Sequence, residues 1–269
     1  MTSPFTNHRI PELFFESEVH SEALDRLRYA GSDWGSCLTS LVGGVGCGKT
    51  SVLEKYISEL QASDHVYVFI KSGYLTFDDI LKTILQKFAA EPDLKDFTRF
   101  AAISFLKELL SILTSQRRRL FLIIDEAQLL SMSDLELLCA LTNENDHLEA
   151  GLVVILSGQT TLWDQICALP QLEQRLSLHY FLQGMSQRET TEYIHSRLKS
   201  SATHNSLSFD DFALDRIYEF SGGVPRKINQ ISKIICEFCL AKEISRVDSA
   251  LVKAVSHDIT PEMKQAVVA

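Results

Sequence analysis

The sequence predicts an α/β protein in which a doubly wound parallel sheet is followed by a smaller, all-helical domain. Short runs rich in Val, Ile, Leu and Phe recur at 37–42, 65–70, 120–125, 152–157 and 178–183. These runs lack polar alternation, which is typical of strands covered on both faces in a parallel sheet. Helical patterns separate the runs, and beyond residue 184 the helical patterns continue without such runs.

The helical patterns between the predicted strands cover 49–62, 76–89, 97–115, 131–143 and 161–168. Strand–helix alternation of this kind implies right-handed crossovers and therefore helices on both faces of the sheet.

The C-terminal part begins with a capping box, in which Ser186 and Glu189 start a helix that runs to about residue 199. A second helix is expected after Ser208, a third over 225–242 with Pro225 in its first turn, and a fourth around 247–257. We therefore expect two domains, residues 1–184 and residues 185–269.

Composition places the chain among ordinary globular proteins, since 45% of its 269 residues are apolar and 23% are charged. The N-terminus lacks the basic and apolar regions of a secretory signal, and no apolar run is long enough to span a bilayer. We expect a cytoplasmic protein without a membrane span. Of the six cysteines, Cys236 and Cys239 have Cys-x-x-Cys spacing, but no second ligand pair for a zinc site lies nearby, and helical periodicity favours two buried residues one turn apart. A net charge of −9 does not favour nucleic acid, although a local basic surface stays compatible with it.

The segment GGVGCGKT predicts a phosphate-binding loop for ATP with Mg²⁺. It matches G-x-x-x-x-G-K-[ST], follows a predicted strand and opens a predicted helix, as that motif requires. Its glycines let backbone N–H groups turn inward around phosphate oxygens, and the helix N-terminus adds partial positive charge. Lys49 is expected to reach the β- and γ-phosphates, and Thr50 to place its hydroxyl on Mg²⁺. The other candidate nucleotide contacts are Gly43, Gly44, Val45, Gly46, Cys47, Gly48 and Ser51.

The segment LFLIIDEAQ favours hydrolysis as the reaction. Asp125 ends a hydrophobic run, where it can hold Mg²⁺ through a water, and Glu126 is placed to orient and polarise an attacking water. A kinase must exclude water from its γ-phosphate, so transfer to a small substrate is disfavoured. An ordinary acidic pair at a strand end is the alternative interpretation.

Three further polar residues are candidates for contacts with the γ-phosphate. Gln159 follows the run LVVILSG and could contact the γ-phosphate or the water, with Ser157 as the competing choice. Arg175 has no obvious carboxylate partner in its own sequence and could reach a neighbouring subunit's γ-phosphate as an arginine finger. Arg226 lies in the first turn of a predicted helix and could fold over the nucleotide. An exposed surface arginine is the alternative for both arginines.

Taken together, these residues resemble the AAA+ ATPases, and more narrowly the ExeA/GspA-like group. The resemblance covers PFTNHRIPELFFESEVHSEALDRL, GGVGCGKT, LIIDEAQLL, LSGQTTLW, QLEQRLSLHYFLQGMSQRETTEYIHSRL and SGGVPRKINQI. It implies a P-loop NTPase core of the ASCE type with strand order 5-1-4-3-2, a helical lid, and an ATP site completed by a neighbouring subunit. The N-terminal element would lie against the adenine. By matching position it assigns Walker A to Lys49 and Thr50, Walker B to Asp125 and Glu126, sensor 1 to Gln159, the finger to Arg175 and sensor 2 to Arg226.

Two functions of different classes stay open. The first is an oligomeric ATPase, in a ring or filament, whose ATP-bound state recruits an unidentified protein partner. The second is an ATP-dependent, DNA-binding regulator of transposition that resembles TniB, TnsC and MuB. The segments that correspond to the DNA channel of that second group, KSGYLTFDD and AEPDLKD, hold few cations. The first function is therefore preferred.

Overall fold

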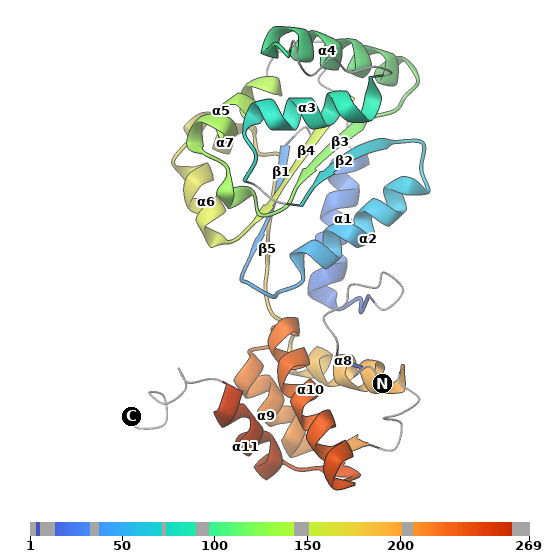
Figure 1. The fold of residues 1–269 in the computed structure, drawn as a ribbon, viewed down its shortest axis with the longest axis vertical. Coiled ribbons are helices and arrows are strands. Elements are labelled where there is room, and N and C mark those ends of the chain that lie inside the picture. The colour runs from blue at the N-terminus through green and yellow to red at the C-terminus, as the bar shows by residue number, and fades with distance from the viewer. Residues whose placement is uncertain are drawn as a thin grey trace. The chain divides into compact units, whose positions relative to one another are not determined.

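The computed structural model describes residues 4–5, 14–32, 38–71, 74–89, 97–142, 151–200 and 207–259, with side chains up to residue 255. The chain divides into two compact units, whose elements are drawn in Figure 1. The sheet unit consists of Glu22–Val45 and Lys49–Leu182. The helical unit consists of Met1–Ser21, Gly46–Gly48 and Gln183–Ala269.

The sheet unit is built on five parallel strands in the order β2-β3-β4-β1-β5, which confirms the predicted order read from the other edge. The strands are β1 (Leu38–Gly43), β2 (Val66–Ile70), β3 (Leu120–Ile124), β4 (Leu152–Gly158) and β5 (Leu178–Leu182). Each predicted apolar run forms a strand, because buried parallel strands need apolar side chains on both faces. Strand β4 pairs with β3 on one side, where Leu120 lies beside Leu152, and with β1 on the other, where Leu38 lies beside Val154.

Helices cover both faces of this sheet, as the alternation predicts. They are α1 (Glu18–Ser32), α2 (Lys49–Gln61), α3 (Phe77–Phe88), α4 (Arg99–Ser115), α5 (Met132–Leu141), α6 (Thr160–Cys167) and α7 (Pro170–Arg175). A short 3₁₀ turn, η2 (Ala127–Leu129), follows β3. Helix α1 starts in the helical unit and continues in the sheet unit.

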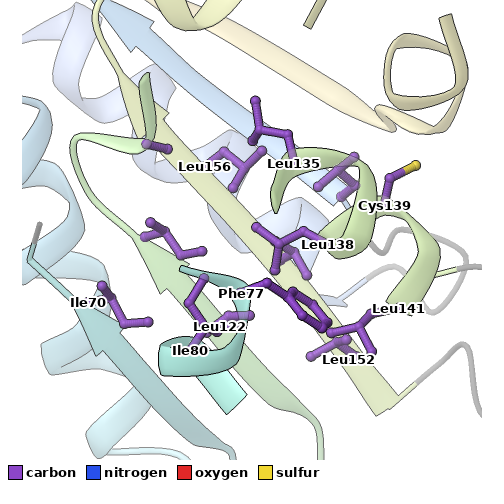
Figure 2. Packing of buried hydrophobic residues seen from close by; sticks show 14 of the residues in the cluster. Ile70, Phe77, Ile80, Leu122, Leu135, Leu138, Cys139, Leu141, Leu152 and Leu156 are labelled. Carbon is purple, nitrogen blue, oxygen red and sulfur yellow. The ribbon is translucent and has the colours of Figure 1, made fainter. Parts of the chain in front are cut away.

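Alternate side chains of each strand point to opposite faces of the sheet and pack against the helices on that face. Figure 2 shows Phe77 of α3 and Leu138 of α5 packed toward Leu122 of β3 and Leu156 of β4, all of them buried. The intervening residue Phe121 points to the opposite face, where its ring meets Tyr56 of α2 edge-on with centroids 6.0 Å apart. All five residues of β3 are buried, so the residues that follow its last position are attached to a rigidly packed strand.

The helical unit contains α8 (Gln187–Lys199), α9 (Asp211–Ser221), α10 (Pro225–Lys242) and α11 (Ser249–Ile259), together with β6 (Ser208–Phe209) and β7 (Arg246–Val247). Ile194, Ile217 and Ile235 lie at the centre of its apolar core. The two-residue strands pair in parallel, a feature that the sequence analysis missed because so short a ladder has no periodicity. As a consequence α9 begins two residues later than expected, with Asp210 rather than Ser208 preceding it.

Local capping signals agree with the structure. Ser186 and Glu189 form the reciprocal capping box of α8, and Pro225 occupies the first turn of α10. Cys236 and Cys239 are buried in the helical core, and burial raises the pKa of the Cys236 thiol to about 12. Among the helices in the described ranges, none combines the length and the apolar character that a bilayer crossing requires.

Candidate functional site

The predicted phosphate loop connects the end of β1 at Gly43 to the start of α2 at Lys49. Gly46 and Gly48 have φ angles of +86° and +102°. Residues with a Cβ rarely adopt such angles, so the loop needs glycine at these two positions. The glycine spacing read from the sequence therefore has a backbone cause in the fold.

Lys49 is the first residue of α2 and is buried, and its side chain reaches back to the carboxyl end of β1. Its Nζ donates hydrogen bonds to the carbonyl oxygens of Gly43 at 2.7 Å and Gly44 at 3.0 Å. An ammonium group removed from water needs such partners, because an unpaired buried charge is costly. These contacts hold the positive charge at the first residues of the loop.

Asp125 follows β3 directly and collects three hydrogen bonds although it is almost fully buried. Its Oδ2 accepts from the hydroxyl of Thr50 at 2.5 Å. Its Oδ1 accepts from the hydroxyl of Ser157 at 2.9 Å and from the backbone N–H of Glu126 at 3.1 Å. The two residues expected to hold Mg²⁺ are thus in direct contact. Ser157, the competing choice beside Gln159, lies against Asp125.

Glu126 has left-handed backbone angles, with φ 54° and ψ 39°. A residue with a side chain pays about 1–3 kcal/mol for such a conformation, so the surrounding structure must hold it there. The turn ends the extended path of β3, and the Glu126 side chain is half-buried. The strand end therefore places two adjacent carboxylates in different surroundings.

Gln128 links Glu126 to Gln159, and the sequence analysis did not single it out. Its Nε2 donates to Oε2 of Glu126 at 2.6 Å, while its Oε1 accepts the backbone N–H of Gln159 at 3.1 Å. The Gln159 side chain also donates to Oε2 of Glu126, at 3.5 Å. The signal available in the sequence was an amide two residues after the acidic pair, in the turn that the strand end requires.

Arg175 is the last residue of α7 and is half-buried. Its Nη1 donates to the carbonyl oxygen of Thr142, at the C-terminal end of α5, across 3.2 Å. Within the described residues, the guanidinium forms no hydrogen bond with Asp125, Glu126 or Gln159. The structure therefore gives this arginine a backbone partner in its own chain, which sequence inspection could not reveal.

The tip of the loop, Gly46–Gly48, groups with the helical unit. The carbonyl oxygen of Gly46 accepts the backbone N–H of Arg226, in the first turn of α10, at 3.3 Å. The carbonyl oxygen of Cys47 lies 2.9 Å from Nε2 of His20. The Arg226 side chain is exposed, but it starts close to the tip, since a Cβ added to Gly46 would lie 2.6 Å from Cβ of Arg226. His20 is a second residue that the sequence analysis missed.

His20 is buried, and burial lowers the pKa of its imidazole. The hydrogen bond to Cys47 and the charge of Glu189 act in the opposite direction without reversing the shift. The ring is therefore neutral near pH 7, with one nitrogen that donates and one that accepts.

The oxygens gathered at Asp125 suit a hard divalent cation. No group of three or more His, Cys, Asp or Glu side chains in a metal-binding arrangement occurs in the part of the chain that the structure describes. Magnesium sites beside phosphates need only one or two carboxylates, since phosphate oxygens and waters complete the coordination. The pair formed by the Thr50 hydroxyl and the Asp125 carboxylate matches that chemistry.

Comparisons with known proteins show a domain family and a shared fold. Residues 35–166 match the AAA domain family. The chain is 31% identical over 251 residues to General secretion pathway protein A of Aeromonas hydrophila. The aligned region covers 93% of this chain and 44% of that protein. The chain thus spans less than half the length of this relative.

Two solved structures share the fold at low sequence identity. The ORC2 protein of Aeropyrum pernix, solved as ADPNP-ADP complexes, has a TM-score of 0.67 and 19% identity over 95% of this chain and 71% of its own. The RuvB Holliday junction branch migration motor of Thermotoga maritima has a TM-score of 0.59 and 20% identity over 95% of this chain and 73% of its own. These likenesses show the fold.

Proposed function

We propose that this chain, which carries an AAA domain over residues 35–166 and has the fold of the P-loop AAA+ ATPases, hydrolyses ATP to ADP and phosphate. One observation carries the proposal. Thr50 of the loop helix and Asp125 at the end of β3 are in contact, and Glu126 follows immediately in a distinct backbone conformation. A cation-binding pair beside a carboxylate suited to act on water is the arrangement that hydrolysis of a phosphoanhydride requires.

The nucleotide is bound by the loop from Gly43 to Ser51. Its backbone N–H groups and the start of α2 receive the phosphates, and the Lys49 ammonium supplies the positive charge. Lys49 already bonds to two loop carbonyls, which keeps the ammonium in place before ATP arrives.

Thr50 and Asp125 would hold Mg²⁺, which neutralises charge on the phosphate oxygens when it is bound. The Thr50 hydroxyl donates to Oδ2 of Asp125 at 2.5 Å, so both oxygens lie close enough to serve one cation. Ser157 keeps the carboxylate in place through its hydrogen bond to Oδ1.

Glu126 orients the attacking water and accepts its proton as the water oxygen bonds to the γ-phosphorus and the bond to the ADP oxygen breaks. The amides of Gln128 and Gln159 both reach Oε2 of Glu126, which fixes the direction of the carboxylate. Gln159 remains the sensor candidate because its side chain lies beside the base.

We further propose that the ATPase acts as an assembly switch, in an oligomer whose ATP-bound form recruits a protein partner. The similarity to General secretion pathway protein A over 93% of the chain supports this proposal. In such an oligomer Arg175 acts on the neighbouring subunit's γ-phosphate, and the exposed Arg226 side chain reports the γ-phosphate from the helical unit.

The test compares Lys49→Ala with Glu126→Gln. We expect Lys49→Ala to lose ATP binding by calorimetry, because the phosphates lose their nearest point charge. We expect Glu126→Gln to bind ATP with Mg²⁺ normally but to release phosphate at least ~10²-fold more slowly, the usual effect of losing a general base.

Matched controls exist on the same elements. Lys55→Ala changes another lysine of α2, and Glu136→Gln changes an exposed glutamate of α5. Both should leave binding and phosphate release unchanged. A wild-type chain that releases no phosphate, or equal loss of binding in Lys49→Ala and Glu126→Gln, would contradict the proposal.

A further inference from the structure

We propose that His20 is a positioning residue for the phosphate loop: its imidazole holds the backbone of the loop tip in the orientation that presents N–H groups to the phosphates. The inference rests on the proposed binding of ATP and adds a residue outside the loop motif. His20 lies 27 positions before Cys47, in the first turn of α1.

The imidazole joins the loop tip to the start of α1 through two hydrogen bonds. Its Nε2 lies 2.9 Å from the carbonyl oxygen of Cys47, and its Nδ1 lies 2.6 Å from Oγ of Ser17. A carbonyl oxygen only accepts, so Nε2 must carry the proton and donate. In the neutral ring Nδ1 then accepts from the Ser17 hydroxyl, which selects this tautomer.

The hydrogen bonds accepted by the Gly46 and Cys47 carbonyls fix the orientation of two peptide planes at the loop tip. In a trans peptide the C=O and the N–H of the next residue point in opposite directions. Anchoring the Cys47 carbonyl on His20 therefore directs the Gly48 N–H away from the ring. The contact from Gly46 to the Arg226 N–H likewise directs the Cys47 N–H away from α10. Both N–H groups belong to the residues expected to surround the phosphates.

Steric fit couples the ring to the loop as closely as the hydrogen bond does. A Cβ added to Gly48 would lie 2.5 Å from Nε2 of His20, so the ring occupies the space next to the bare backbone. Phe14 packs edge-on against the imidazole with centroids 5.9 Å apart. The ring therefore has little freedom to leave the tip.

The first turn of α1 is itself fastened to α8. Oε1 of Glu189 accepts the backbone N–H of Glu18 at 2.6 Å, and Oε2 caps α8 through Ser186. This carboxylate holds the segment that carries Ser17 and His20. The loop tip thus depends on a preformed network in the helical unit, which lowers the ordering cost of binding phosphate.

A buried histidine that only fills the core makes a different prediction. Replacing it would change the stability of the fold. The affinity for ATP would then vary among variants with their stability and would not depend on whether a hydrogen-bond donor stands in the place of Nε2. Two substitutions separate these roles. His20→Gln keeps an amide nitrogen near the position of Nε2, whereas His20→Leu fills similar space without a donor.

The experiment measures the dissociation constant of a non-hydrolysable ATP analogue with Mg²⁺ by calorimetry, and the Tm without nucleotide, for the whole chain. We expect His20→Leu to weaken binding about tenfold, the effect of one lost hydrogen bond to a buried backbone group, and His20→Gln to stay within about threefold of wild type. The exposed His195→Leu is the matched control and should bind as wild type does.

The ratio of the Leu and Gln dissociation constants decides the outcome. A ratio above about three supports the inference, and a smaller ratio overturns it whatever the Tm values are. If His20→Leu does not fold, Ser17→Ala decides: weaker binding by at least about twofold supports the inference, and unchanged binding overturns it. A wild-type chain that binds no ATP analogue contradicts the proposed function and the inference with it, whereas wild-type binding with a small ratio contradicts the inference alone.

Discussion

The side-chain amide of Gln128 donates to the Glu126 carboxylate across 2.6 Å and accepts the backbone N–H of Gln159 across 3.1 Å. Gln128 thus joins Glu126, which follows β3, to Gln159, which follows β4. Glu126 needs such support, because its left-handed backbone would not be kept without contacts that hold it. The orientation of the proposed base depends on an amide outside the acidic pair.

Gln128→Ala should lower kcat for ATP hydrolysis about tenfold and leave KM nearly unchanged. The carboxylate loses its shortest hydrogen bond and its fixed direction, while the phosphate loop is untouched. Steady-state phosphate release measures both constants. Gln230→Ala, which changes an exposed glutamine of α10, is the control. An unchanged or faster kcat in Gln128→Ala would show that the amide does not orient the base.

Two adjacent glycines should respond very differently to alanine. Gly222 and Gly223 both have positive φ, at 59° and 70°. A Cβ on Gly222 meets nothing within 4 Å, so Gly222→Ala should cost only the left-handed conformation, about 1–2 kcal/mol. A Cβ on Gly223 would lie 1.8 Å from the Met185 carbonyl oxygen, so the backbone must move and the loss should exceed about 3 kcal/mol. Urea denaturation measures both free energies, and equal losses would refute the argument.

The stability of the fold should fall as the pH drops through the unfolded pKa of histidine, about 6.5. Burial lowers the pKa of His20 in the folded chain, so just below that pH the unfolded chain binds more protons and the free energy of unfolding decreases. Glu189, the charged group that acts on His20, opposes the shift without cancelling it.

His20→Gln should reduce this pH dependence between about pH 7.5 and 5.5, a window above the titration of ordinary carboxylates. The slope should not vanish, because burial also lowers the pKa of His65 in the folded chain. Urea denaturation at each pH measures the effect. Identical slopes for wild type and His20→Gln would mean that His20 does not carry it.

Arg175 should act across a subunit boundary. Mixing inactive Arg175→Ala with inactive Lys49→Ala should restore part of the hydrolysis, because some interfaces then pair an intact loop with an intact arginine. Phosphate release from titrated mixtures measures the gain. Activity that never exceeds the sum of the two separate variants would leave Arg175 with its role inside the chain, the hydrogen bond to the Thr142 carbonyl.

The sequence alone was sufficient to predict the features that depend on residues close together along the chain. Apolar runs predicted the five strands and their burial, and the capping box of Ser186 and Glu189 predicted the start of α8. The order of the strands came from the resemblance to a known family, since periodicity does not say which strands pair. The positions of Asp125 and Glu126 at a strand end also followed from local pattern.

Only the tertiary structure decided which polar atoms meet. Ser157 reaches Asp125 across 32 positions of sequence, and His20 reaches Cys47 across 27. Such pairs arise when parallel strands end at one edge of a sheet, or when a helix start packs against a loop. Backbone acceptors such as the Cys47 and Thr142 carbonyls are present in every residue, so sequence cannot mark them. The sequence therefore determined the chemical groups of the candidate site, and packing determined how each one is held.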